Sequence, residues 1–366
     1  MLLAGDIGGT KTELAIVSAE AGPRNPLAHG VFPSAQYPSL EAIVREFLDR
    51  TSYPVDRAWF DVAGPVIRQR AKITNLPWTI DAATLKDEFH LQSVRLLNDL
   101  EAIALAVPVL QPDDLHTVNA GQAVPGGALA VVAPGTGLGE GYLTWDGAAY
   151  EAHASEGGHT DFAPADELQT GLLQYVRKHV SGGDHVSTER VCCGSGIPTI
   201  YDYLRDSGYA PETPEIAARL AKVKDRTPII VEAGMQLFLS QQGAVGARHA
   251  SPVQQEATPD RKILPTSDRL MPAMSCSLCA ATFDTFVAVL GAEAGNMALK
   301  VLATGGVYLG GGIPRRIIPA LETDRFLHAF RRKGRLSDVL ERVPIHVITR
   351  QAAIIGAARS GLMSTE

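Results

Sequence analysis

The sequence predicts an α/β protein of two domains with a cleft between them, and three observations support this. The chain has 366 residues, which at ~150 residues per domain corresponds to about two domains. Short apolar and β-branched runs alternate with segments whose apolar residues recur at helical spacing. A strand, a glycine turn and a second strand open the chain, and this pattern returns at Ala128. Two related halves would thus each present a glycine turn to a shared cleft.

The first third of the chain alternates strand and helix patterns. Ser39 is a suitable N-cap for the helical run that follows it, and Asp81 is a suitable cap for a later one. In order, we expect strands over Leu2–Ile7 and Glu13–Ser18, a helix over 40–50, a strand over 58–64, a helix over 79–89 and a strand over 94–99.

The rest of the chain also alternates strand and helix patterns. A strand over 128–132 leads into a glycine turn and another strand, and later glycines bracket a short strand before a helix expected over 313–330. An apolar run over 283–302 also predicts a helix. The stretch over 241–274 is rich in Pro, Gln, Ser and Ala without periodicity, so we interpret it as an exposed insertion.

Composition excludes several classes of protein. Hydrophobic residues make up 45% of the chain, enough for sizeable cores, and the net charge is −7. Nucleic-acid and membrane-surface binders are usually net positive, so neither partner is expected. Four cysteines do not make a disulfide framework. The N-terminus lacks a basic region before an apolar stretch, and no run reaches ~18 uninterrupted apolar residues, so we expect a cytoplasmic protein.

The first glycine turn has the features of a phosphate-binding loop. Gly8 and Gly9 allow backbone N–H groups to approach phosphate oxygens, because they carry no Cβ. Thr10 adds a hydroxyl donor and Lys11 adds a cation. Asp6, at the end of the strand, is placed to hold Mg²⁺ directly or through water.

Alone, such a turn is more often an ordinary hairpin. It is not a dinucleotide-binding turn, because a strand and not a helix follows, and the P-loop spacing is missing. A second turn at Gly135, Thr136 and Gly137, and a third cluster in which Gly311 and Gly312 open a helix, favour nucleotide binding. The second turn would hold phosphate, and the third cluster would lie against the nucleoside.

Several polar residues would suit a sugar. Asn98 and Asp99 end a strand at the cleft, where Asp99 could accept a proton from an alcohol during phosphoryl transfer; the alternative is an Asx pair that merely ends the strand. Glu156 and His159 flank two glycines, which is either a ligand-binding turn or a solvated one. Glu189 is either a further sugar contact or a surface carboxylate.

Taken together, these motifs resemble the bacterial-type glucokinases of the actin-like ATPase-domain superfamily, whose fold is ribonuclease H-like. The resemblance covers nearly the whole chain, in order and spacing. Its motifs are DIGGTKT at the N-terminus, AGPV (63–66), TNLPW (74–78), LND (97–99), GTGLG (135–139), EGGH (156–159), ERV (189–191) and GGVYLGGGI (305–313).

The resemblance implies which reaction the protein catalyses and which residues bind the substrates. It implies ATP-dependent phosphorylation of glucose at its 6-hydroxyl, with Mg²⁺ as cofactor and Asp99 as the general base. The sugar-binding positions of the family correspond here to Asn98, Asp99, Glu156, His159 and Glu189. Asn75 corresponds to a loop near the sugar pocket. The turns at Gly8–Lys11 and Gly135–Gly137 correspond to its phosphate loops.

The boundary between the two domains is expected near VPVLQPDD (107–114), where prolines and acidic residues cluster. A small domain would comprise 1–108 and the C-terminal helix at about 351–362, and a large domain would comprise 109–350. The insertion at 241–274 is longer than the family's usual connection, and a homodimer is the family expectation.

Cysteine spacing separates this chain from the related repressor/kinase (ROK) family, which has a structural zinc site after the sugar-binding histidine. No cysteine follows His159 closely here, and Cys276 and Cys279 form a lone CxxC. A structural zinc usually needs four ligands, so we expect no zinc and predict that both cysteines are packed in the core.

Two alternative functions stay open at this point, and the loops alone do not separate ATP from polyphosphate as the phosphoryl donor. A kinase for another hexose would keep the same motifs, because one pocket side chain can change which epimer fits. A catalytically silent sugar-sensing regulator would need a DNA-binding segment, yet the first predicted phosphate strand starts at Leu2.

Overall fold

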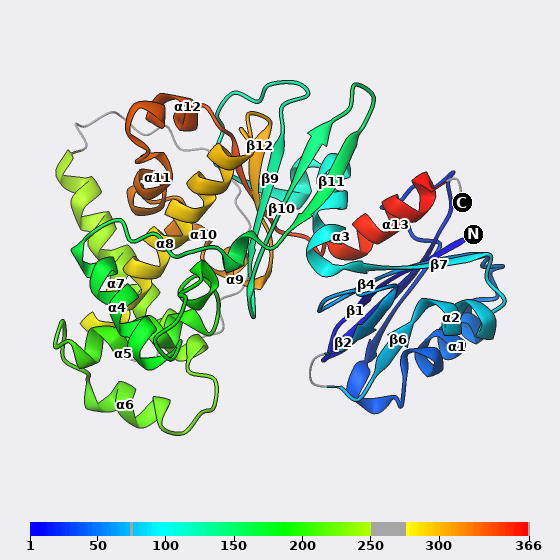
Figure 1. Cartoon of the computed structure of the whole chain (residues 1–366), viewed down its shortest axis with the longest axis horizontal. Helices are drawn as coiled ribbons and strands as arrows, with labels where there is room; N and C mark the ends of the chain where they lie inside the picture. The colour runs from blue at the N-terminus through cyan, green and yellow to red at the C-terminus, as the bar shows by residue number, and fades with distance from the viewer. Residues whose placement is uncertain (74–75, 250–275, 365–366) are drawn as a thin grey trace, which may run out of the picture.

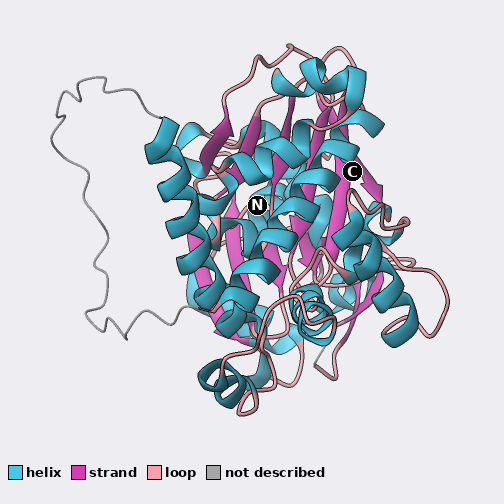
Figure 2. Ribbon diagram, turned by 90° about the vertical axis from the view of Figure 1, so that its left-hand side faces the viewer, coloured by secondary structure: helices cyan, strands magenta, loops and turns pink. Residues whose placement is uncertain are grey.

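The computed structural model of the protein describes residues 1–73, 76–249 and 276–364. Two β-sheets organise this part of the chain, one built from its N-terminal third and one from the remainder (Figure 1). Helices cover the strands, as the turned view shows (Figure 2).

The N-terminal sheet has the strand order β3-β2-β1-β4-β7. β1 pairs antiparallel with β2 and parallel with β4, which pairs parallel with β7. The polar ends of β1, β4 and β7 therefore meet at one edge. The strands are β1 (Leu2–Ile7), β2 (Lys11–Val17), β3 (Ala28–Pro33), β4 (Arg57–Val62) and β7 (Ser93–Asn98).

Helices pack on both faces of this sheet because β1 is apolar on both sides. Leu3 and Ile7 join a core with α1 (Leu40–Thr51) and α2 (Ala82–Glu88). Leu2 and Ala4 join another with α3 (Asp99–Ala106) and α13 (Ala353–Met363). The predicted strands and the helix over 40–50 are confirmed, and the Ser39 side chain caps α1 by accepting from the Ala42 N–H at 3.4 Å.

The predicted helix over 79–89 begins later than expected. Thr79–Asp81 forms strand β6, which pairs with β5 (Arg70–Lys72), and α2 starts at Ala82. Asp81 nevertheless caps it as predicted, accepting from the Ala83 N–H at 2.9 Å.

The second sheet has the order β11-β10-β9-β12-β13-β8. Its β9–β10 hairpin is flanked by an antiparallel β11 and a parallel β12, the same local arrangement as around β1. The predicted repeat of strand, glycine turn and strand is thus confirmed. The strands are β8 (Leu115–Asn119), β9 (Leu129–Pro134), β10 (Leu138–Trp145), β11 (Tyr150–Ser155), β12 (Gly306–Leu309) and β13 (Ile345–Ile348).

Helices surround this sheet. They are α4 (Glu167–His179), α5 (Gly196–Asp206), α6 (Pro214–Leu220), α7 (Thr227–His249), α8 (Ser277–Lys300), α9 (Gly312–Arg316), α10 (Ile318–Leu321), α11 (Asp324–Arg331) and α12 (Ser337–Glu341). The 3₁₀ turns are η1 (Ser34–Gln36), η2 (Val107–Val109), η3 (Pro112–Asp114), η4 (Gly157–His159), η5 (Thr188–Arg190) and η6 (Gly334–Leu336).

Helix α8 is the central helix of the second half and includes the apolar run predicted to be helical. By length and composition alone it could cross a membrane, but 83% of its apolar window is buried within the protein. It packs against α5, α7 and α11, so its apolar residues form part of the hydrophobic core.

Two other predictions need correction. The segment 313–330 is not one helix but parts of α9, α10 and α11, because Pro319 lacks the N–H that a continuous helix would use and α11 restarts after Thr323. The expected insertion over 241–274 overlaps α7, which continues to His249. Its remainder, 250–274, lies outside the described residues.

The C-terminal helix α13 returns to the beginning of the chain. It packs against α3, β1 and β4 (Figure 1). This packing supports the division into 1–108 with about 351–362 and 109–350, which remains a proposal.

Candidate active site

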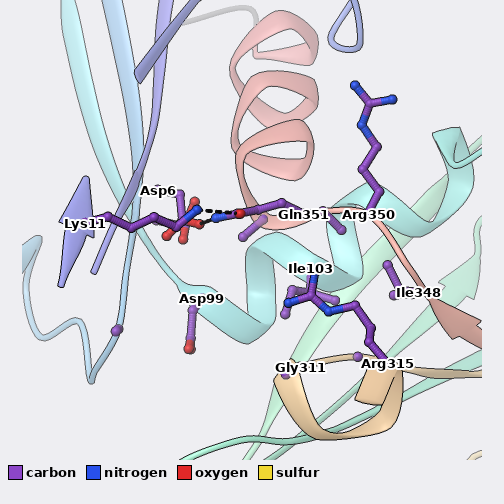
Figure 3. Close-up of a pocket in the computed structure, with 15 residues that line it drawn as sticks. Asp6, Lys11, Asp99, Ile103, Gly311, Arg315, Ile348, Arg350 and Gln351 are labelled. Carbon is purple, nitrogen blue, oxygen red and sulfur yellow. Dashed lines mark hydrogen bonds between the residues drawn. The ribbon is translucent and has the colours of Figure 1, made fainter. Parts of the chain in front are cut away.

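A pocket of about 330 Å³ lies between the two sheets, within the size range of small-molecule sites. Both halves of the chain line it (Figure 3). Asp6, Lys11 and Asp61 come from the N-terminal sheet, and Asp99 comes from α3. The opposite wall is formed by Gly310–Gly312, Arg315, Ile348 and Arg350, and Gln351–Ala353 complete the lining.

The first glycine turn joins β1 to β2 and is held from outside by Ser34. The Gly8 N–H donates to the Lys11 carbonyl at 3.0 Å. Ser34 donates its hydroxyl to the Gly8 carbonyl at 2.7 Å and its N–H to the Thr10 carbonyl at 3.1 Å. Carbonyls of the turn are therefore fixed on the side of Ser34.

Lys11 and Asp6 are linked by Gln351, which the sequence analysis did not single out. The Lys11 ammonium donates to Gln351 Oε1 at 2.7 Å and to Glu13 Oε2 at 3.0 Å. Gln351 in turn donates its amide N–H to the Asp6 carboxylate (Figure 3). Burial raises the pKa of Asp6 above its ordinary value, and the Gln351 donor opposes this rise.

Asp99 is the first residue of α3, directly after β7. Asn98 caps this helix, accepting from the Leu100 N–H at 2.9 Å and donating its amide to the Gly64 carbonyl at 3.0 Å. Asp99 also accepts from the Leu100 N–H, at 2.9 Å. The carboxyl is accessible from the pocket, yet the surrounding protein limits its hydration and raises its pKa, while the Leu100 N–H opposes the rise.

The second glycine turn lies beside Glu189. The Gly135 N–H donates to the Gly137 carbonyl at 2.8 Å, and the Leu138 N–H donates to Glu189 Oε2 at 2.9 Å. A Cβ at Gly137 would lie 2.5 Å from the same carboxylate oxygen, so a larger residue here would displace the Glu189 side chain.

The other predicted sugar residues gather around Glu189. His159 Nδ1 lies 3.9 Å from Glu189 Oε1, and the His159 N–H donates to the Glu156 carbonyl at 3.0 Å. Glu156 and His159 are exposed. His159, Glu189 and the second turn thus form one cluster, which Glu156 joins through its backbone carbonyl.

The structure brings only some of the predicted residues into the pocket. Asp6, Lys11, Asp99 and Gly311–Gly312 line it, whereas the second glycine turn and the cluster around Glu189 do not. The two groups are neighbours, because a Cβ at Gly139 of β10 would lie 3.1 Å from the Leu100 side chain, next to Asp99. Gly8, Gly9 and Thr10 lie in the first turn, and Asn75 lies outside the described residues.

Asp61 is a pocket residue that the sequence analysis missed. It lies in register with Asp6 on the neighbouring parallel strand. Burial raises its pKa well above the ordinary value, and the carboxyls of Asp6 and Asp99 add to the rise. One signal was present in the sequence: a lone carboxylate inside the apolar run AWFDVAG.

Two arginines of the opposite wall were also missed. Arg350 lies 3.5 Å from the Asp114 carboxylate. Within the described part of the chain, no hydrogen bond or ion pair holds the guanidinium of Arg315, which extends from the wall toward Ile103 (Figure 3). The pocket therefore contains cations that could meet phosphate oxygens.

The oxygen ligands at the base of the pocket suit a hard cation. Carboxylate oxygens are what Mg²⁺ prefers, and it commonly uses one or two of them together with water and phosphate oxygens. Among the described residues, no group of three or more His, Cys, Asp or Glu side chains could hold a metal alone. Asp6 fits a partial coordination shell of this kind.

The cysteines lie away from the pocket. Cys276 and Cys279 are fully buried in the core of the second half, which confirms the predicted packing. Cys276 Sγ accepts from the Cys279 N–H at 3.2 Å at the start of α8.

Comparisons with known proteins agree with this arrangement. A family model described as Glucokinase matches residues 3–255 and 254–362. The chain is 37% identical over 362 residues to a glucokinase of Nostoc punctiforme, with 98% of each chain covered. A glucokinase structure from an Antarctic psychrotroph is 29% identical, with 98% of each chain covered and a TM-score of 0.74.

A more distant structure shares the architecture. It is a ROK family glucokinase from Streptomyces griseus, solved with glucose and AMPPNP. It is 19% identical, has a TM-score of 0.53, and the match covers 98% of this chain and 97% of that one. These likenesses confirm the predicted α/β fold of the actin-like ATPase type.

Proposed function

This chain belongs to the glucokinase family of sugar kinases, and we propose that it transfers the γ-phosphoryl group of ATP to the 6-hydroxyl of glucose. The products are glucose 6-phosphate and ADP. One observation carries the proposal: a single pocket joins the first glycine turn's Lys11, the carboxyl of Asp99 and the Gly310–Gly312 wall. The glucose and AMPPNP bound to the Streptomyces griseus enzyme support the same pair of substrates.

Asp99 acts as the general base. As the sugar's O6 attacks the γ-phosphorus in line, its proton passes to the Asp99 carboxylate, and the bond to the β–γ bridging oxygen of ATP breaks. A raised pKa makes this carboxylate a stronger base than an ordinary aspartate, and Asn98 fixes its position by capping α3.

The nucleotide lies along the glycine segments. Gly8 closes the first turn, because its N–H donates to the Lys11 carbonyl. The phosphates are bound by the backbone N–H groups of Gly9 and Thr10, the Lys11 ammonium and the turn over 135–137, while Gly311 and Gly312 lie against the nucleoside. Asp6 holds Mg²⁺, directly or through water. When bound, Mg²⁺ neutralises charge that develops on the phosphate oxygens.

The sugar is held from two sides. Asn98 and Asp99 approach it from the N-terminal half, and Glu156, His159 and Glu189 approach it from the other half. Carboxylates accept from neighbouring hydroxyls, while an imidazole can donate or accept, so this set matches a hexose. Asn75 is the remaining proposed contact.

The role of Asp99 is tested by Asp99→Ala. The variant should lose roughly 10²–10⁴-fold in kcat, the usual scale for a general base, and still bind glucose in a calorimetric titration. Glu101→Ala is the matched control, since this carboxylate lies in the first turn of the same helix but outside the pocket. An Asp99→Ala enzyme within a few-fold of wild-type kcat would remove Asp99 from this role.

The substrate is tested by an ADP-release assay across a panel of hexoses. Glucose should give the highest kcat/KM. A higher value on mannose or an N-acetylhexosamine would identify a kinase for that sugar. Retained sugar binding without turnover on any hexose would identify a sugar-sensing regulator instead.

A further inference from the structure

Asp61 is an anomaly in the N-terminal sheet. Its side chain is fully buried, and neither of its carboxylate oxygens has a hydrogen-bond partner among the described residues. Burying a carboxyl group without a donor is unfavourable, so a buried carboxylate is normally paired or bound to a metal. Packing alone gives no reason for an acid at this position.

The position of Asp61 shows what lies beside it. Residues opposite each other in paired strands point to the same side of the sheet, and neighbouring strands are about 4.8 Å apart. Asp6 of β1 and Asp61 of β4 form such a pair, and both line the pocket. Two carboxyl groups therefore stand side by side at the base of the site.

The nearby donors are engaged elsewhere. Gln351 donates to Asp6, and the Lys11 ammonium donates to Glu13 and Gln351. Neither gives a bond to Asp61. Lys11 favours the ionised form of Asp6 through space, but no cation of the described residues is hydrogen-bonded to Asp61, and adjacent buried carboxylates repel each other.

We propose that Asp61 and Asp6 together form the binding site of a divalent cation, with Asp61 as its second carboxylate ligand. This rests on the proposed function, in which Asp6 holds the Mg²⁺ that accompanies ATP. Two protein carboxylates leave the other coordination positions to water and phosphate oxygens, which is how Mg²⁺ is usually held in phosphoryl-transfer sites.

Metal binding by the whole protein tests whether both carboxylates bind the cation. Mn²⁺ serves as a paramagnetic probe, and electron paramagnetic resonance measures the free ion with protein alone and with protein plus ADP. We expect Asp61→Asn and Asp6→Asn each to weaken Mn²⁺ binding by about ten-fold or more. Asp99→Asn is the matched control, because it removes a carboxyl of the same pocket on the next element, and it should change the affinity much less.

Thermal stability gives an independent readout. Because Asp61 is buried without a donor, Asp61→Asn should raise the Tm of the metal-free protein, whereas the Tm gain on adding Mn²⁺ should shrink. Asp61→Ala, which removes both oxygens, repeats the test should the amide disturb folding. A merely structural Asp61 would give the reverse: a lower Tm and an unchanged gain with Mn²⁺.

The outcomes separate this inference from the proposed function. If wild type phosphorylates glucose with Mg·ATP while both Asp61 variants bind Mn²⁺ as wild type does, Asp61 is no ligand and the function stands. If wild type binds no Mn²⁺ specifically, with or without ADP, the proposed cation site does not exist. If Asp6→Asn alone loses affinity, Asp6 is the only carboxylate that binds the metal.

Discussion

Gln351 uses both ends of its amide in the pocket. Its oxygen accepts from Lys11 at 2.7 Å, and its nitrogen donates to Asp6. Because the amide oxygen and nitrogen have different partners, the orientation of this side chain is fixed. The residue lies two positions before α13, so the start of this helix positions a cation and a carboxylate contributed by β1 and β2.

Arg315 is expected to contact the phosphates of ATP. Charge-assisted hydrogen bonds contribute roughly 1.5–3 kcal/mol, so Arg315→Ala should raise the KM for ATP about ten-fold or more and change the KM for glucose little. Steady-state kinetics with each substrate varied in turn measures both. Arg316→Ala, on the same helix but outside the pocket, is the control and should leave both constants near wild type. Equal KM values for ATP in the two variants would contradict the assignment.

At the scale of elements, β10 and α8 meet through a pair of buried acids. Glu140 of β10 is fully buried, and Glu293 of α8 lies next to it, accepting from Lys300 at 3.1 Å and from Asn296 at 2.9 Å. Burial, and then the charge of Glu293, raise the pKa of Glu140 to about 8, against the opposing effect of Lys300. The Cys192 thiol and the Lys333 ammonium are further titratable groups near this pair.

This pair predicts a pH-dependent stability. Between about pH 5 and the folded pKa of about 8, the unfolded chain has released the Glu140 proton and the folded protein keeps it. Stability from this group is therefore greatest below about pH 5, falls steadily as pH rises toward the folded pKa of about 8, and falls no further above it. The free energy of unfolding should fall by at most about 1.4 kcal/mol per pH unit from this group.

Glu140→Gln should remove that contribution. Urea unfolding of wild type and variant across this pH range measures the difference between them, which should widen in favour of the variant as pH increases. Parallel stability curves would show that Glu140 titrates normally.

The docking of α13 on α3 depends on Gly356. A Cβ at this position would overlap the Ala102 carbonyl of α3, which is backbone and cannot rotate away. Gly356→Ala should therefore lower the free energy of unfolding by about 1–3 kcal/mol, although alanine favours helix by itself. Ser360→Ala, on the same helix, should change it by less than about 0.5 kcal/mol. Chemical denaturation measures both, and equal stabilities would mean that the helices can separate without cost.

Local patterns allowed much of this fold to be predicted. The Ser39 cap and the apolar period of α1 are contained in a few residues, and the two glycine hairpins repeat within one chain. The break between α9, α10 and α11 was missed, although Pro319 marked it, because the apolar period continues across it. Asp61 was missed for another reason: its proximity to Asp6 depends on the pairing of β1 with β4, which no local pattern reveals.

At the scale of the whole molecule, the proposed sugar contacts lie on two sides. Asp99 lines the pocket between the sheets, whereas Glu156, His159 and Glu189 cluster outside its lining. A hexose that binds both groups at once would draw them together, which also excludes water from the phosphoryl group.

Glucose should therefore make the protein more compact. Small-angle X-ray scattering should show a smaller radius of gyration with D-glucose than without it, and no change with L-glucose as the control sugar. His159→Ala should reduce the effect. An unchanged radius at saturating D-glucose would mean that the sugar binds without closure.

Because α13 packs on the N-terminal sheet, this sheet is synthesised well before one of the helices that cover it. Leu2 packs against Gly361, and Arg57 of β4 donates to the Gly361 carbonyl at 3.2 Å. The ribosome therefore releases β1 and β4 long before it makes the helix that covers one of their faces. Until α13 emerges, the part of that apolar face which α13 covers stays exposed in the nascent chain, where a chaperone can bind it. Proteins truncated before α13 should consequently be captured by chaperones or aggregate, because strands that are made early are covered by a helix that is made much later.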